Sequence, residues 1–380
     1  MKIGIEILFP KAYTYMVSKK HLVGHALSSV IFHGGILMLK RIMPLMLALC
    51  MLALAGCKKD QDRLSVDKGD EPSIVSETKP VTYKNPLTGV SGMSEEKTKN
   101  RPVAVMINNI STAQPVQTGL NKADTVYETE VEGGITRLLA VFQDITTVEK
   151  VGTIRSARYP YVDLAMGHNA IYIHCGQDNK YCAPHLKDTD DVDLMSKNYG
   201  VRIKNGLASE HTLYAYGEKL WSSLVKDGHK TTSSEATPWV NFAEEDAHVT
   251  LESPAKTINI PASASYRTIF KYDEAKGKYT RYYGNTLRKD YFTGETVDMK
   301  NVFILFTSIR NYQDNYHRQV LLESGDGYYC VNGTCTPIKW SKGAAKNGFK
   351  FTKADGSELT VNPGNSWVNI VNIGNTPTFG

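Results

Sequence analysis

The sequence predicts an α+β protein in which a layered N-terminal α/β sandwich with a mixed sheet is followed by a mostly β C-terminal domain. Short runs rich in β-branched and aromatic residues, separated by glycine, asparagine and aspartate, recur from about residue 81 to the end. Few helical patterns interrupt them, and the lack of a regular strand–helix–strand repeat disfavours a doubly wound sheet. With 380 residues, 41% of them hydrophobic, the chain is long enough for about two domains with proper cores.

The first segment, residues 81–241, alternates strands with a few helices. Strands are predicted at residues 102–109, 123–131, 135–142, 151–154 and 170–174. The break at Glu132-Gly133-Gly134 between two of these strands predicts a hairpin. Pro160 suits the first turn of a short helix over residues 161–166.

The second segment, residues 248–380, is expected to be nearly all β. Strands are predicted at residues 266–272, 278–283, 302–308, 318–322, 328–331, 350–352 and 367–371. Gly325-Asp326-Gly327 and Asn332-Gly333 predict tight turns between them.

The N-terminal region predicts a lipoprotein signal peptide. Lys40-Arg41 precede an apolar run over residues 42–54, which is followed by Ala55-Gly56-Cys57. A charged start, a short apolar segment and small residues before a cysteine are typical of a lipobox, with residues 38–56 as the signal and Cys57 as the lipidated residue. The alternative is a transmembrane helix, but the apolar run of about 13 residues is shorter than the ~20 that a span needs. We therefore expect attachment to the cell membrane by acyl chains on Cys57, with the body facing the extracytoplasmic side.

Two further expectations concern the flanks of this signal. Translation is expected to begin at Met38, which makes residues 1–37 an upstream extension of the reading frame. Residues 57–80 are polar and rich in charge, serine and proline, which predicts a flexible tether after the lipidated cysteine.

The charge distribution disfavours a nucleic-acid-binding body. The whole chain has 44 basic and 39 acidic residues, a net charge of +5. Residues 1–57 contain six of the basic and one of the acidic residues, so the rest of the chain carries 38 of each. Phosphate affinity needs an excess of lysine and arginine, which the body lacks.

The cysteines of the body predict disulfides. Cys330 and Cys335 flank an Asn-Gly turn, so they are expected at facing positions of a hairpin, where an extracytoplasmic protein forms a disulfide. Cys175 and Cys182 are candidates for a second bridge in a surface loop. The alternative is a zinc site of His174, Cys175, Cys182 and His185, but the H-C-x6-C-x2-H spacing matches no common finger. We predict neither a metal nor a cofactor.

A candidate ligand or catalytic site centres on Arg155 and Arg158, between a strand end and a helix start. Two guanidiniums and free helix N–H groups suit a carboxylate or phosphate. The hypothesis is a cleft that binds an anionic cell-wall fragment or performs general acid–base hydrolysis. Its members are Asn108, Glu132, Arg137, Arg155, Arg158 and His211.

The alternative is a structural network in which Arg155, Arg158, Glu128 and Glu132 pair with one another. Six further residues could either line the same ligand site or have an ordinary role in packing and turns. They are Asn109, Gln114, Tyr159, Tyr161, Trp221 and Trp239. The chain contains no nucleophile elbow, Walker loop, His-Glu-x-x-His or Gly-x-Gly-x-x-Gly motif. An enzyme is therefore the less favoured hypothesis.

Several longer motifs resemble the YerB-type lipoproteins, a bacterial family with paired N- and C-terminal domains of unknown function. The motifs span residues 85–89 (NPLTG), 101–109 (RPVAVMINN), 132–137 (EGGITR), 154–158 (IRSAR), 210–214 (EHTLY) and 362–367 (NPGNSW). The resemblance covers about residues 81–375. It implies a lipid-anchored, surface-exposed protein with an α+β sandwich first, and it implies no established activity, cofactor or catalytic residue. Cys330, Cys335 and residues 1–37 look like features specific to this chain.

These observations predict a membrane-anchored lipoprotein that acts as a binding or interaction module at the cell envelope. The alternative is an envelope hydrolase that acts on cell-wall material through the Glu/Arg/His cleft. The expected partners are the membrane, through the lipid, and a cell-wall or envelope component.

Overall fold

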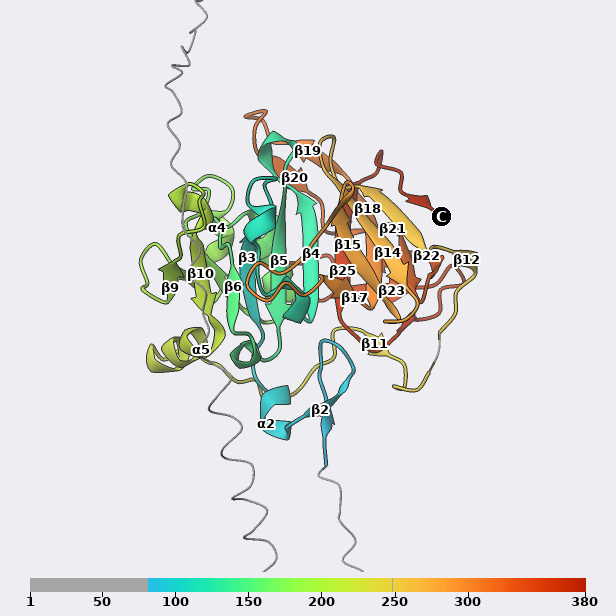
Figure 1. Cartoon of the computed structure of the whole chain (residues 1–380), viewed down its shortest axis with the longest axis horizontal. Helices are drawn as coiled ribbons and strands as arrows, with labels where there is room; N and C mark the ends of the chain where they lie inside the picture. The colour runs from blue at the N-terminus through green and yellow to red at the C-terminus, as the bar shows by residue number, and fades with distance from the viewer. Residues whose placement is uncertain (1–80, 248) are drawn as a thin grey trace, which may run out of the picture. The chain divides into compact units, whose positions relative to one another are not determined.

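The structure, a computed structural model, describes residues 81–247 and 249–380 (Figure 1). The expectations for residues 1–37, the signal, Cys57 and the tether lie outside the described residues. All described residues belong to one compact unit.

A mixed sheet of 11 strands runs through this unit, in the order β12-β22-β21-β18-β25-β4-β5-β3-β7-β8, with β23 attached to β22. The first segment supplies β3 (Val103–Asn108), β4 (Thr125–Glu130), β5 (Thr136–Phe142), β7 (Ile171–His174) and β8 (Asp191–Asp193). The second supplies β12 (Ser253–Pro254), β18 (Asn301–Thr307), β21 (Ser324–Val331), β22 (Thr334–Ser341), β23 (Lys350–Thr352) and β25 (Ser366–Asn372).

The two segments meet inside this sheet, because β25 pairs in parallel with β4, with Trp367 opposite Val126. On its other side β25 pairs in parallel with β18. Strands of both segments therefore share one core. The boundary near residues 241–248 and the layered N-terminal sandwich stay predictions in their details.

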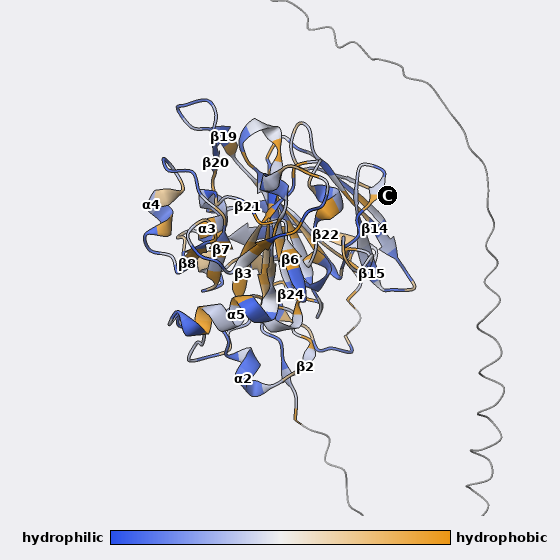
Figure 2. Cartoon of the chain, turned by 60° about the vertical axis from the view of Figure 1, so that its left-hand side comes forward, coloured by the Kyte–Doolittle hydropathy of each residue, from blue (hydrophilic) through white to orange (hydrophobic). Residues whose placement is uncertain are grey.

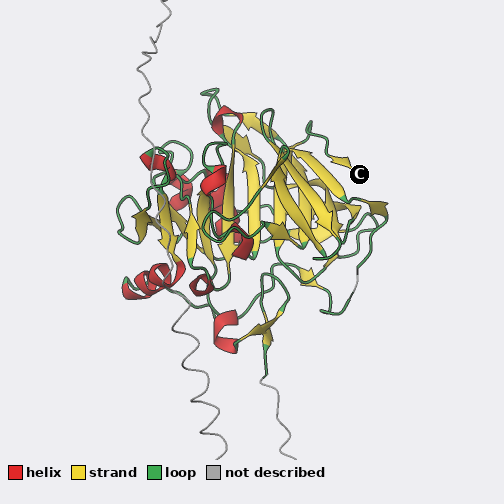
Figure 3. Cartoon of the chain, viewed as in Figure 1, coloured by secondary structure: helices red, strands yellow, loops and turns green. Residues whose placement is uncertain are grey.

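Smaller sheets pack around the large one (Figure 3). The six-stranded sheet comprises β13 (Thr257–Pro261), β14 (Arg267–Asp273), β15 (Lys278–Tyr283), β16 (Thr286–Leu287), β17 (Asp298–Met299) and β26 (Thr378–Phe379). The three-stranded sheet comprises β6 (Lys150–Gly152), β9 (Gly200–Arg202) and β10 (Leu213–Tyr216). The two-stranded pairs are β1 (Tyr83–Lys84) with β2 (Ser91–Met93), β11 (Asn241–Phe242) with β24 (Thr360–Val361), and β19 (Ile309–Asn311) with β20 (Arg318–Val320).

Helices are short and few among the described residues. The α-helices are α2 (Glu95–Thr98), α3 (Tyr159–Gly167), α4 (Ala183–Leu186) and α5 (Gly217–Lys226). The 3-10 turns are η1 (Gln114–Val116), η2 (Leu120–Lys122), η3 (Glu132–Gly134), η4 (Ile145–Thr147) and η5 (Ser209–His211).

Alternate residues of the central strands face two separate hydrophobic clusters. Val103, Val105 and Ile107 of β3 contribute to the cluster that includes the six-stranded sheet and α5. Ala104 and Met106 contribute to the cluster that includes α3 and Trp340. Because both faces are covered, β3 forms a nearly continuous apolar run instead of alternating with polar residues. Figure 2 shows hydrophobic strands in the middle of the described part and hydrophilic segments at its periphery.

Most predicted strands are confirmed to within a few residues, and the fold is mostly β with mixed sheets. The hairpin at 132–134 is confirmed, with Glu130 opposite Thr136 and left-handed φ values at Gly133 and Gly134. The predicted helix is α3, with Pro160 in its first turn. The prediction missed α5, although its buried Leu220 and Leu224 lie four residues apart, and it missed β22, although its buried and exposed residues largely alternate.

In the described residues, no helix combines the length and the hydrophobicity that crossing a bilayer requires.

Candidate functional site

The six residues of the predicted cleft come together in two polar groups. Glu132 lies in η3 between β4 and β5, and Arg158 caps the start of α3. Arg137 is on β5, Asn108 ends β3 and His211 ends η5. These positions follow from the antiparallel β3–β5 pairing, which places Asn108 opposite Arg137.

The first group is an ion-pair cluster of Glu132, Arg158 and Arg137. Arg158 Nε donates to both carboxylate oxygens of Glu132 at 2.7 and 2.9 Å. Arg137 Nη2 lies 3.8 Å from Glu132 Oε1, and its Nη1 donates to the carbonyl oxygen of Ser156. Burial opposes ionisation of Glu132, but hydrogen bonds and the charge of Arg158 outweigh it, so the pKa of Glu132 is below its usual value. Burial, and then the charge of Arg158, lowers the pKa of Arg137 to about 10.

The second group joins Arg155, Glu210, His211 and Asn108. Arg155 Nη2 lies 3.0 Å from Glu210 Oε1, and His211 Nε2 lies 3.4 Å from the same oxygen. The amide nitrogen of Asn108 lies 2.8 Å from His211 Nδ1. Arg155 thus pairs with Glu210, which the structural alternative did not include.

The geometry favours the structural alternative for these side chains. The hollow beside Glu132 and Arg158 has a volume of about 10 Å³, room for roughly one water molecule. Glu132 is bound by two guanidiniums, which is unlike a general acid with a raised pKa. Tyr159 and Tyr161 are buried and donate to backbone carbonyls, so neither is available for stacking on a sugar.

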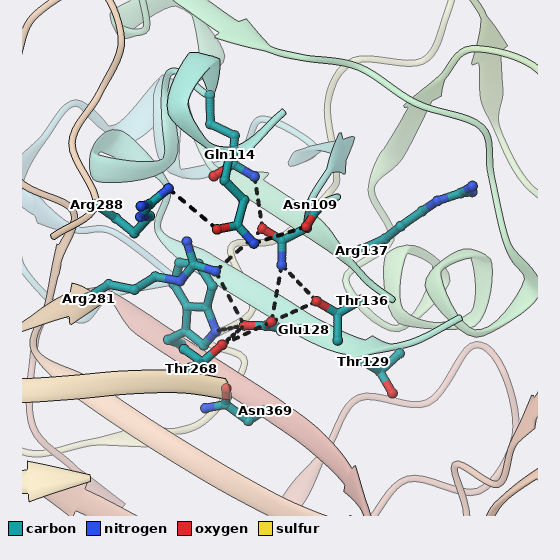
Figure 4. A network of polar contacts seen from close by, with 12 residues as sticks. Asn109, Gln114, Glu128, Thr129, Thr136, Arg137, Thr268, Arg281, Arg288 and Asn369 are labelled. Atoms are coloured by element: carbon teal, nitrogen blue, oxygen red, sulfur yellow. Dashed lines mark hydrogen bonds and ion pairs between the residues drawn. The ribbon is translucent and has the colours of Figure 1, made fainter. Parts of the chain in front are cut away.

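Glu128 belongs to a separate network in the core (Figure 4). Its carboxylate accepts hydrogen bonds from Asn109, Thr136, Thr268 and Trp367. Arg281 Nη2 lies 3.8 Å away, and the side chains of both charged residues are fully buried. Arg137 extends away from this network, because it follows Thr136 on β5 and points to the opposite face. The network joins the two segments, since Thr268, Arg281 and Trp367 come from the second.

The cysteines are free thiols in the described residues. Cys330 and Cys335 are directly opposite each other on β21 and β22, which confirms the predicted hairpin geometry. The disulfide between them, and that between Cys175 and Cys182, stay predictions. Of the alternative zinc ligands, His174 already has partners for both ring nitrogens, the Gly176 carbonyl and Asp191. His185 contacts Asp163, and no group of three or more ligand-type residues is arranged for a metal in the described ranges.

A larger hollow lies around Trp239. We call it the Trp239 groove, and it consists of two adjoining pockets of about 410 and 590 Å³ that share Pro86, Pro238, Trp239, Phe349 and Lys350. Both volumes fall in the range of small-molecule sites. The groove is therefore large enough to hold a small-molecule ligand next to an aromatic side chain.

The NPLTG motif at residues 85–89 positions Trp239. Trp239 Nε1 donates to the carbonyl oxygen of Leu87 at 2.8 Å, and the backbone N–H of Trp239 donates to the carbonyl oxygen of Pro86. The indole contacts Phe303 and Phe351 edge-to-face, with ring centroids 5.9 and 6.1 Å apart. These contacts hold a half-buried indole at the junction of the two pockets.

Three polar side chains, those of Tyr127, His168 and Lys342, line the first pocket. The hydroxyl of Tyr127 lies 2.7 Å from His168 Nε2. Burial, and then the charge of Lys342, lowers the pKa of His168 to about 4, so the neutral ring accepts a hydrogen bond from the Tyr127 hydroxyl. Lys342 is only 5% exposed, and burial lowers its pKa to about 8. At neutral pH its ammonium is still mostly protonated.

Close packing at Gly167 brings the Lys342 loop to α3. A Cβ at Gly167 would approach the Asn347 carbonyl oxygen to 2.7 Å, so this contact requires glycine. Gly167 therefore places Lys342, Lys346 and Asn347 beside His168.

Two family models match the chain. The N-terminal domain of a protein of unknown function, DUF3048, matches residues 87–230, and the C-terminal domain of DUF3048 matches residues 257–368. The chain belongs to the DUF3048 family.

Relatives of DUF3048 type agree with this assignment. The protein named "Putative lipoprotein YerB" of Bacillus subtilis (strain 168) is 32% identical over 298 residues, covering 76% of this chain and 86% of that protein. The crystal structure of YerB from Bacillus subtilis superposes with a TM-score of 0.67 at 29% identity, covering 76% of this chain and 96% of that one. The resemblance to YerB-type lipoproteins is confirmed.

The DUF3048 ranges divide the Trp239 groove into three parts. Tyr127 and His168 lie in the N-terminal range, and Lys342 and Phe349 in the C-terminal range. Trp239 lies in residues 231–256, which neither range includes. The groove therefore combines both DUF3048 domains with the connection between them.

Sequence reasoning named Trp239 as one of four scattered aromatics but missed the groove. The sequence analysis did not single out Tyr127, His168 or Lys342 as site residues. No spacing in the sequence relates these residues, because they come from separate parts of the chain.

Proposed function

We propose that the protein is a membrane-anchored, non-catalytic binding module of the cell envelope, and that the Trp239 groove is its ligand site. The observation behind this proposal is the groove itself, with an aromatic side chain at its centre and polar groups on one side. Such a mixture of apolar surface and a few placed polar groups is typical of ligand pockets.

The proposed location rests on the lipobox and the relative. Cys57 follows a signal-type segment, and a family member is named as a lipoprotein. Acyl chains on Cys57 would anchor the body at the extracytoplasmic face of the cell membrane, within reach of cell-wall material. A binding protein in this position needs neither cofactor nor metal.

The alternative of an envelope hydrolase receives less support. The proposed acid, Glu132, has its carboxylate engaged by Arg158 and Arg137, and its pKa is lowered instead of raised. The hollow next to it is too small for a substrate.

Co-sedimentation with purified cell walls tests the proposal. The chain from residue 57 with Cys57→Ser keeps every described residue, and we expect it to sediment with walls. Trp239→Ala should reduce the affinity about tenfold or more, as expected for an aromatic anchor at the centre of a site. The matched control is Tyr316→Ala, which removes a 58% exposed aromatic outside the groove and should leave binding unchanged.

Thermal unfolding of each variant separates loss of binding from loss of fold. Equal sedimentation of a folded Trp239→Ala variant would reject the groove as the site. No sedimentation of the parent chain would reject wall binding.

A further inference from the structure

We propose that the Trp239 groove selects an acidic sugar, that is, a sugar ring carrying a carboxylate or a phosphate. This inference rests on the proposed function, because it assigns a ligand class to the same groove.

The charge of the first pocket favours an anion. Lys342, Lys346 and Lys350 line it together with one carboxylate, that of Glu235. His168 is neutral at pH 7, so the pocket carries a net charge of about +2 while the body as a whole carries an equal number of acidic and basic residues. A concentration of one sign of charge in a hollow raises the local concentration of the opposite ion.

None of these three lysines forms an ion pair with another side chain of the described ranges, although many other lysines do. Lys84, Lys97, Lys99 and Lys122, for example, each lie within 3.3 Å of a carboxylate oxygen. No carboxylate of the described residues therefore lies within ion-pair distance of these three ammonium groups, although the charge of Asp163 favours the charged form of Lys342.

Lys342 is the best-placed of the three for recognition. Its ammonium donates to the carbonyl oxygens of Ala344 and Ala345 at 3.2 and 2.7 Å. An ammonium has three N–H donors, so these two bonds fix its position and leave one donor for a ligand. A buried, fixed cation loses little entropy on binding and gains a charge-assisted hydrogen bond.

The remaining surface suits a ring with hydroxyl groups. Trp239 supplies a flat apolar face, and Pro86 and Pro238 continue this surface into the second pocket. The amide side chains of Asn100 and Asn347 line the same pocket and can both donate to and accept from hydroxyls, whereas the amide nitrogen of Gln143 already donates to backbone carbonyls. An inorganic anion would leave this apolar and amide surface without contacts.

Direct titration with small sugars tests the ligand class. The probes are N-acetylmuramic acid, which carries a carboxylate, N-acetylglucosamine 6-phosphate and neutral N-acetylglucosamine, added to the chain from residue 57 with Cys57→Ser. We expect at least one acidic sugar to bind about tenfold or more tightly than the neutral one, because a charge-assisted hydrogen bond contributes that much. The two acidic probes distinguish a carboxylated from a phosphorylated source.

The charge-reversal variant Lys346→Glu/Lys350→Glu should abolish this preference. Both lysines are exposed, so the change should leave the fold intact. The matched control is Lys219→Glu/Lys226→Glu on α5, which makes the same change of charge away from the groove.

The outcomes separate the two proposals. Equal binding of neutral and acidic sugars, or a preference that survives the groove reversal, overturns the acidic-sugar inference and leaves the binding module standing. Binding to cell walls but to none of the three sugars also overturns the inference alone. Absence of both wall and sugar binding overturns both.

Discussion

Glu128 of β4 and Arg281 of β15 form a fully buried ion pair across the two DUF3048 domains, with 3.8 Å between Oε2 and Nη2. The guanidinium also lies 4.5 Å from the centre of the Trp367 ring, and Trp367 donates to Glu128. Burial lowers the pKa of Arg281 to about 10. Two atoms of this guanidinium, Nε and Nη1, have no hydrogen-bond partner in the described residues. The pair therefore depends on the network in Figure 4 to remain charged in the core.

Arg281→Ala is expected to lower the free energy of unfolding by about 3–5 kcal/mol, because it leaves the Glu128 charge buried without its partner. Urea denaturation measures the change. In a double-mutant cycle, Glu128→Gln/Arg281→Met should cost less than the sum of its single substitutions. Lys256→Ala, in an exposed pair with Glu274, is the control and should leave the free energy of unfolding nearly unchanged. The prediction would be contradicted if Arg281→Ala lowered the free energy of unfolding no more than Lys256→Ala does.

Arg158→Ala is expected to destabilise the protein by about 3 kcal/mol at pH 7, because Glu132 loses its main partner. The pKa of Glu132 is lowered in the folded state, so the stability from this pair is present above the ordinary pKa and is lost as pH falls through the lowered value. The difference in free energy of unfolding between the parent protein and Arg158→Ala should therefore shrink in acid, below about pH 4.5.

Arg155→Ala is the matched control for this measurement. Its partner Glu210 is 53% exposed, so the loss should stay under about 1 kcal/mol at every pH. If the free energies of unfolding of the parent protein and Arg158→Ala differ by the same amount from pH 7 to acid, the charge of Glu132 does not contribute to stability through this pair.

Affinity for an acidic ligand is expected to fall as pH rises through about 8. Burial lowers the pKa of Lys342 to about 8, so above this pH the side chain loses its proton and its positive charge. Asp163 favours the charged form, and the neighbouring His168 is neutral throughout this range. Titrations from pH 6.5 to 9.5 measure the effect, and Lys342→Met should remove the pH dependence. An affinity that stays constant through pH 8 would exclude Lys342 as the recognising cation.

Cys57→Ser is expected to move the full chain from the membrane fraction to the soluble fraction, because the thiol is the predicted acylation site. Fractionation followed by immunoblotting measures the distribution. Cys50→Ser, which changes the other cysteine of the N-terminal region, is the control and should leave the protein with the membrane. Membrane attachment that survives Cys57→Ser would contradict lipid anchoring at this residue.

Local patterns predicted much of the secondary structure and part of the polar site. The strands from residue 102 to 142, the turn at Gly133-Gly134 and the hairpin between Cys330 and Cys335 depend on neighbours in the chain. The Arg158–Glu132 pair was also foreseen, since two charged motifs flank one hairpin and one helix start. The partner of Glu128 was not, because Arg281 is 153 residues away and its strand shows no special pattern.

The sequence by itself predicted a lipoprotein-type N-terminus, and it determined the neutral body, the family and most strand positions, because each depends on residues that are close together along the chain. Only the tertiary structure decided that β4 and β25 pair, and that Tyr127, Trp239 and Lys342 meet around one groove. The physical reason is that strand and turn preferences are local, whereas the pairing of distant strands is selected by burial of both sheet faces together.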